Sequence, residues 1–147
     1  MDNLNLPLRI DSPAIIKHIE IYQNLIVRMA TNSGECKKWA IGLVSAIMVL
    51  VAEKGIASAA ILAGIPIILF CFLDAYYLAL EKQFRNAYQC FLDKLNNEQL
   101  IVNDLCRVTT DGKLPSTFLK ALSSLAVWPF YLGMLLLVVL AWVIIRI

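Results

Sequence analysis

The sequence predicts an all-α integral membrane protein with three transmembrane helices and a cytoplasmic pair of amphipathic helices, which we call the stalk. The first reason is composition. Of the 147 residues, 60% are hydrophobic and only 16% are charged, a balance outside that of soluble globular domains. The second reason is that residues 56–73 and 121–145 contain no charged side chain, and each stretch can cross about 30 Å of hydrocarbon as a helix.

The first expected helix covers residues 13–33 and is amphipathic. Ser12 followed by Pro13 is typical of a helix start, because a serine hydroxyl can cap a free N–H and proline loses no hydrogen bond at the first position. Ile19, Tyr22 and Ile26 recur at spacings of three and four, so they form one apolar stripe. Such a stripe requires an apolar partner.

We expect the first transmembrane span at residues 38–54. The helical pattern breaks at residues 31–34, and Lys37 and Lys38 mark the membrane interface. The uncharged part of this span, residues 39–52, is about 21 Å long as a helix, which is short for a bilayer.

The second span, residues 56–75, follows so closely that the two spans must form an antiparallel hairpin. Gly42 on the first span and Gly64 on the second indicate close backbone packing between them. Pro66 lacks an N–H and predicts a kink near the middle of the second span.

The helix of the second span is expected to continue beyond the membrane to about residue 96. Phe84, Tyr88 and Phe91 form an apolar stripe there, which we expect to pair with the stripe of the first helix as the stalk. We interpret residues 97–115 as a connector that contains one short helix. Residues 117–146 are expected to form the third span.

The distribution of basic residues predicts the orientation. Of the 13 lysines and arginines, five lie up to and including Lys38 at the start of the first span, and six lie from the end of the second span up to and including Lys120 in the first turn of the third. Lys54 and Arg146 are on the opposite side of the membrane. The positive-inside rule therefore places the N-terminus and the stalk in the cytoplasm, and the C-terminus outside.

Asp74 and Glu81 share a helical face at the inner end of the second span, and two interpretations of them stay open. In a homo-oligomer they could ring the mouth of a cation-permeable pore. Alternatively, Asp74 forms an ion pair with Lys37 or Lys38 at the same depth, which is how membrane carboxylates are often satisfied.

The sequence predicts no catalytic site, no metal site and no cofactor. It contains one histidine, His18, which we interpret as a surface residue of the first helix, with a pH switch as the alternative. The cysteines, Cys36, Cys71, Cys90 and Cys106, show no CxxC spacing. With a net charge of only +2, we expect no direct binding of nucleic acid.

Two segments carry a resemblance to a known family. RMATNSGECKKWAIGLVSAI (residues 28–47) and PIILFCFLDAYYLALEKQFR (residues 66–85) resemble the SLATT-type small membrane proteins of bacterial anti-phage defence systems. The resemblance implies paired membrane helices in the bacterial inner membrane. In that membrane, the orientation predicted by the basic residues makes the N-terminus cytoplasmic and the C-terminus periplasmic. It also implies a membrane-permeabilising effector triggered by a partner sensor, and this chain shows no recognisable sensor domain of its own.

The leading hypothesis is an oligomeric inner-membrane effector of anti-phage defence that depolarises the membrane when a cytoplasmic partner triggers it. The alternative is a non-conducting membrane anchor whose stalk recruits a soluble defence or signalling protein. A small channel or transporter subunit is a third class, weakened by the lack of charged residues at mid-depth in the spans.

Overall fold

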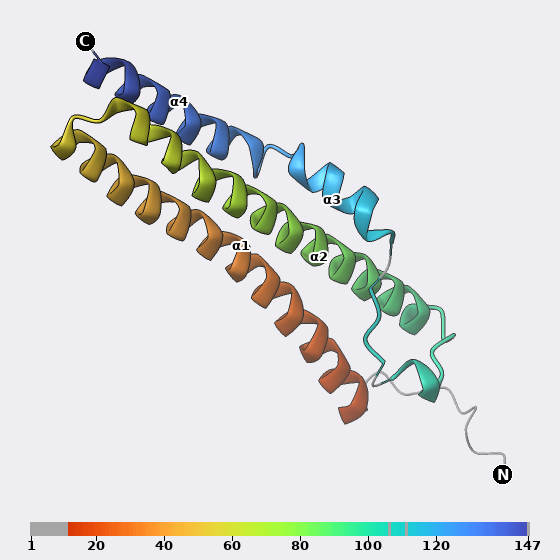
Figure 1. The fold of residues 1–147 in the computed structure, drawn as a ribbon. Helices are drawn as coiled ribbons and strands as arrows, with labels where there is room; N and C mark the ends of the chain where they lie inside the picture. Colours follow the sequence, from red (N-terminus) through yellow and green to blue (C-terminus); the bar gives the residue numbers. More distant parts are fainter. Residues whose placement is uncertain (1–11, 106, 111, 147) are drawn as a thin grey trace.

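The computed structural model describes residues 12–105, 107–110 and 112–146, which form an elongated helical bundle (Figure 1). Helix makes up 85% of the structure, and the described residues contain no strand, so the predicted all-α class is confirmed. In chain order, the described elements are α1 (Pro13–Lys54), the 3₁₀ helix η1 (Ala57–Ala63), α2 (Gly64–Asn96), the 3₁₀ helix η2 (Val102–Asp104), α3 (Leu114–Leu122) and α4 (Trp128–Arg146).

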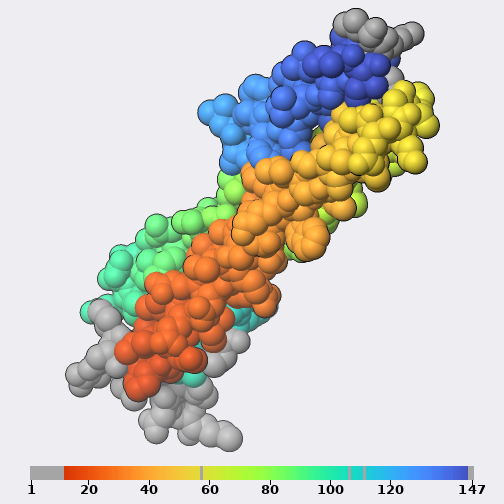
Figure 2. Space-filling model, turned by 90° about the vertical axis from the view of Figure 1, so that its left-hand side faces the viewer, coloured from red at the N-terminus to blue at the C-terminus, as the bar shows by residue number. Residues whose placement is uncertain are grey.

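The two longest helices, α1 and α2, form an antiparallel hairpin, and α3 and α4 return along α2 (Figure 1). Gly55 ends α1 in the left-handed conformation, φ 64°, which glycine adopts without steric cost. The C-terminal end of α4 lies beside this hairpin turn (Figure 1). From the side, α1 runs along the length of one face of the molecule (Figure 2).

The predicted break at residues 31–34 is wrong: α1 is one continuous helix of 42 residues, about 63 Å long. It begins at Pro13, although the Ser12 hydroxyl makes no capping bond. Gly34 costs a helix only about 1 kcal/mol, and the side chain of Ser33 bonds to α2 instead of competing with its own backbone. Packing of α1 along α2 therefore outweighs the low helix propensity of residues 31–34.

The helix that contains Pro66, α2, begins only at Gly64, so the proline does not interrupt a longer α-helix in the middle of the second span. Pro66 is the third residue of α2, within the first turn, where backbone N–H groups have no intrahelical partner. The preceding segment, η1, is a tighter 3₁₀ helix, so the chain changes helix type before the proline.

The predicted third helix, residues 117–146, is divided into α3 and α4 by residues 123–127. The Ser123 hydroxyl donates to the carbonyl oxygen of Leu119 at 3.1 Å, a local bond that competes with helix continuation. Pro129 has no N–H that could bond the carbonyl of Leu125. It is the second residue of α4, a position at which a helix needs no such bond.

Two hydrophobic cores hold the bundle together. The upper core joins α1, η1, α2 and α4 and includes the buried residues Ala40, Val44, Ala63, Ile67, Val127, Tyr131 and Met134. The stalk core joins the first turns of α1 to the last turns of α2 and includes Ile15, Tyr22, Ala87, Phe91, Leu95 and Leu100.

The residues expected to pair in the stalk do pack together. Tyr22 lies with its ring centroid 6.0 Å from that of Tyr88 and 6.2 Å from that of Phe91. Ile19, Phe84 and Tyr88 are half-buried against the same core. Ile26 is half-buried beside Tyr88, where both line a groove on the stalk surface.

The expected close packing at Gly42 and Gly64 is not found, since a Cβ built at either glycine meets nothing within 4 Å. The face of α1 that meets the bundle passes through Ala40 and Val44, and Gly42 lies about 200° around the helix from Ala40. Alanines make the close contacts instead: Ala40 and Ala63 are each 0% exposed.

Candidate functional site

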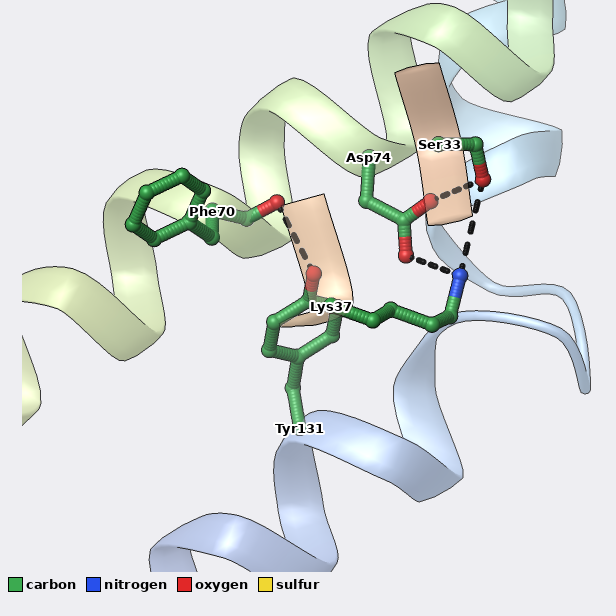
Figure 3. Close-up of polar contacts among 5 residues, drawn as sticks. All are labelled: Ser33, Lys37, Phe70, Asp74 and Tyr131. Carbon is green, nitrogen blue, oxygen red and sulfur yellow. Dashed lines mark hydrogen bonds and ion pairs between the residues drawn. The ribbon is translucent and has the colours of Figure 1, made fainter. Parts of the chain in front are cut away.

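A polar cluster of Ser33, Lys37 and Asp74 joins α1 to α2 (Figure 3). Along both helices it lies between the residues of the upper core and those of the stalk core. Ser33 and Lys37 lie one turn apart on α1 and both point at Asp74 on α2. The ammonium Nζ of Lys37 is 2.5 Å from Asp74 Oδ2, and the Ser33 hydroxyl donates to Asp74 Oδ1. Lys37 Nζ also donates to Ser33 Oγ at 3.5 Å, which closes the triangle.

Burial makes this cluster energetically important. The side chain of Asp74 is fully buried, whereas that of Lys37 is 26% exposed. Removing one partner of a buried ion pair costs about 3–5 kcal/mol, because the other charge is left uncompensated. The cluster therefore fixes α1 and α2 in one register.

A third helix is attached one turn away. The hydroxyl of Tyr131 on α4 donates to the carbonyl oxygen of Phe70 at 3.1 Å, and Phe70 lies one turn before Asp74 on α2 (Figure 3). Tyr131 is buried, so this bond satisfies a polar group inside an apolar contact. All three long helices thus meet at the same level.

The other two charged residues predicted for the site, Lys38 and Glu81, form separate ion pairs within their own helices. Lys38 lies 2.6 Å from Glu35 on its own helix, and both side chains are well exposed. Glu81 accepts a hydrogen bond from Arg85 one turn further along α2, at 2.7 Å. The Glu81 side chain is 13% exposed and that of Arg85 is 61% exposed. A solvent-exposed pair such as Lys38–Glu35 contributes about 0–1 kcal/mol. The structure therefore brings Asp74 together with Lys37, but not with Lys38.

The interpretation of His18 as a surface residue is wrong. Its side chain is buried in the stalk core, with its ring centroid 5.1 Å from that of Tyr22 and 4.6 Å from that of Phe91. Burial lowers the pKa of His18, and the nearby carboxylate of Asp104 partly opposes this shift. His18 continues the buried line of Ile15 and Tyr22 at helical spacing.

Ser33 and Tyr131 were not among the predicted site residues. Ser33 stands four residues before Lys37, and this spacing of two polar side chains at an expected interface could have indicated a shared face. The sequence carries no signal for Tyr131, since the acceptor of its hydroxyl is a backbone carbonyl 61 residues away. Cys106, one of the four cysteines considered in the sequence analysis, lies outside the described residues.

Among the described residues, no group of three or more His, Cys, Asp or Glu side chains is arranged to hold a metal ion. Two described helical stretches, Ser58–Asn96 and Trp128–Ile145, are long and apolar enough to cross a membrane. Comparison with protein-family models, curated proteins and solved structures gave no match to this chain. What the fold and the cluster define is an all-helical bundle compatible with membrane insertion.

Proposed function

We propose that α1, α2 and α4 each cross a membrane, with the stalk in the cytoplasm. The support is a band of exposed large apolar side chains at the same level on the three helices. On α1 it includes Ile41, Val49 and Leu50; on the η1–α2 segment Ile61, Ile65 and Ile68; and on α4 Leu136, Leu137 and Leu140. An exposed apolar surface of this extent requires lipid or a partner around it.

Topology can be tested with single cysteines introduced into a chain whose native cysteines are replaced by alanine. Lys54→Cys, in the hairpin turn, should react with a membrane-impermeant maleimide added to intact spheroplasts. Arg28→Cys, on the stalk, should react only after the membrane is opened. Labelling of both positions, or of Arg28→Cys alone, in intact spheroplasts would contradict this arrangement.

We further propose that the chain is an oligomeric effector of anti-phage defence that permeabilises the bacterial inner membrane when a cytoplasmic partner triggers it. The observation that carries this proposal is the continuity of α1 and α2 from the stalk into the apolar layer. A movement imposed on the stalk would pass through rigid helices to the Lys37–Asp74 cluster. The buried pair then corresponds to the closed state, in which the Asp74 carboxylate is turned to Lys37 and away from any lumen.

The test of the defence role is phage plating on cells that carry the chain with its genomic neighbours. We expect fewer plaques than on cells in which this chain alone is deleted. Equal plating on both strains would contradict a role in defence.

A non-conducting anchor is the second candidate, favoured by the complete burial of Asp74 and by the groove on the stalk surface. This groove, about 440 Å³, lies between α1 and α2 and is lined by Gln23, Ile26, Val27, Arg85, Tyr88 and Gln89. It mixes apolar and polar side chains, as protein-binding surfaces commonly do. If the anchor role holds, Val27→Asp, at an exposed groove position, should release a soluble partner while ion permeability stays constant throughout infection.

A further inference from the structure

The polar cluster between α1 and α2 holds one positive charge among oxygen atoms. The ammonium Nζ of Lys37 lies 2.5 Å from Asp74 Oδ2, and it donates to Ser33 Oγ at 3.5 Å. Because the Ser33 hydroxyl directs its own hydrogen at Asp74 Oδ1, the lone pairs of Ser33 Oγ remain for the cation (Figure 3). Oxygen atoms of this kind are also the ligands that hard metal cations prefer.

The contact between Lys37 and Asp74 depends on charge rather than on hydrogen-bond direction. Asp74 Oδ2 is buried, and it accepts no hydrogen bond of normal geometry from any described residue, although Lys37 Nζ lies beside it. A lysine ammonium is a compact point charge, without the fixed fork of a guanidinium. A free cation of the same charge can therefore take its place without the loss of a directional bond to Oδ2.

The two partners differ in a way that allows such an exchange. Asp74 is fully buried between the helices and cannot move to water, whereas the side chain of Lys37 is 26% exposed. A lysine stem can carry its head group outward into water, and the space that the ammonium leaves is then open to solvent beside Asp74. The carboxylate keeps a matching charge throughout, since one ammonium leaves and one cation enters.

We propose that Asp74 and Ser33 form a binding site for a monovalent metal cation, K⁺ or Na⁺, which the ammonium of Lys37 occupies in this structure. A divalent cation is disfavoured, because the cluster has a single carboxylate and one positive charge would remain buried without a partner. The site also differs from a transition-metal centre, which is built from several His, Cys or carboxylate side chains that the described residues do not bring together.

This inference deepens the proposed effector function, on which its biological meaning rests. Ionisable side chains inside a membrane commonly mark the path of an ion. Lys37 is then a tethered competitor that keeps the site closed to free cations, and its withdrawal from Asp74 opens the site.

The first experiment removes the tethered ammonium and its stem with Lys37→Ala. The purified full chain is melted in uncharged detergent micelles at pH 8 and followed by circular dichroism, with potassium chloride replacing choline chloride at constant total salt. Choline carries the same charge but is too bulky to enter between the oxygens. Once the site fills, Tm of Lys37→Ala should rise by about 3–6 °C for each tenfold increase in K⁺. A Tm that does not depend on K⁺ would show that the carboxylate takes up a proton instead, and would overturn the proposal.

Two control variants locate the effect of K⁺. Lys38→Ala changes the adjacent lysine, whose ammonium pairs with Glu35 at the surface, and its Tm should not depend on K⁺. Addition of Asp74→Asn to Lys37→Ala should abolish the dependence. If either control responded to K⁺ as strongly as Lys37→Ala, the cation would bind elsewhere and the site would be refuted.

The unchanged chain provides a second test that stands even if Lys37→Ala does not fold. A small amine-reactive ester acetylates lysines, and mass spectrometry gives the rate at each position. When K⁺ replaces choline, the rate at Lys37 should rise about twofold or more, because the displaced ammonium turns to water, while the rate at Lys38 stays constant. A rate at Lys37 that is insensitive to K⁺ would contradict the exchange. None of these measurements involves membrane potential, so the cation site and the effector role can fail independently.

Discussion

Lys37 on α1 places its ammonium 2.5 Å from the carboxylate of Asp74 on α2, and the two partners differ in their access to water. Asp74 is fully buried, whereas the side chain of Lys37 is 26% exposed. A lysine that loses its partner can extend its stem toward water, but a carboxylate buried between helices cannot. Removing Lys37 and removing Asp74 should therefore lower the free energy of unfolding by different amounts.

Lys37→Met should destabilise the chain more than Asp74→Asn does. The first change leaves a buried carboxylate without its cation, at a cost of about 3–5 kcal/mol. The second leaves a neutral amide that can still accept the Ser33 hydrogen bond, at a cost of about 1–3 kcal/mol. The measurement is the free energy of unfolding in mixed micelles, followed by far-ultraviolet circular dichroism during titration with dodecyl sulfate.

Lys38→Met is the matched control for this experiment. Its exposed pair with Glu35 should contribute less than about 1 kcal/mol. If Lys37→Met and Lys38→Met had equal effects, the buried pair would not be what fixes α1 against α2.

The face that α1 presents to the bundle can be tested by Ala40→Leu and Gly42→Leu, which add bulk two residues apart. Ala40 is 0% exposed in the upper core, so the larger side chain should overpack it and cost about 1–3 kcal/mol. A side chain at Gly42 meets nothing within 4 Å, and replacing glycine should raise helix stability by up to about 1 kcal/mol. The same unfolding titration measures both, and a reversed order would contradict the packing of α1.

Stalk stability should fall as the pH is lowered from 7.5 toward 5.5. Burial lowers the pKa of His18 in the folded chain, while the unfolded chain titrates near its ordinary pKa of about 6.5. Below that pH the unfolded state binds a proton that the folded state does not, so protonation favours unfolding until the pH reaches the folded pKa. Amide hydrogen exchange of residues 15–22 measures this opening.

His18→Phe keeps an aromatic ring in the stalk core and removes the titrating group. Its exchange rates, corrected for intrinsic pH effects, should vary less over the same range than those of the unchanged chain. Retention of the full pH dependence in His18→Phe would assign it to another group, such as Asp104, whose pKa is lowered by the hydrogen bond from Lys94.

Periodicity and composition predicted the all-α fold, the helical hairpin and the stalk contacts, because these depend on patterns within single helices. Tyr22, Tyr88 and Phe91 were expected to pair from their spacing alone, and they do pack together. The α3–α4 break was missed because the long apolar run masked the effect of Ser123 and Pro129. In that run, hydrophobicity indicated a continuous helix while local hydrogen bonding divided it.

The polar cluster could be predicted only in part. An Asp74 ion pair with Lys37 or Lys38 was one expected alternative, but choosing between adjacent lysines requires the rotation of α1 about its axis. The structure turns Lys37 inward and leaves Lys38 beside Glu35 at the surface. Burial of His18 was missed for the same reason, since the buried face of a helix is decided by its partner.

The most direct test of the effector role is membrane potential, read with a voltage-sensitive dye in cells that express the chain with its genomic neighbours, before and after phage challenge. The account predicts depolarisation after challenge, altered by Asp74→Asn without loss of membrane insertion and unchanged by Lys38→Met. A constant potential in cells that remain phage-resistant would contradict the effector and favour the stalk as a docking platform for a soluble partner.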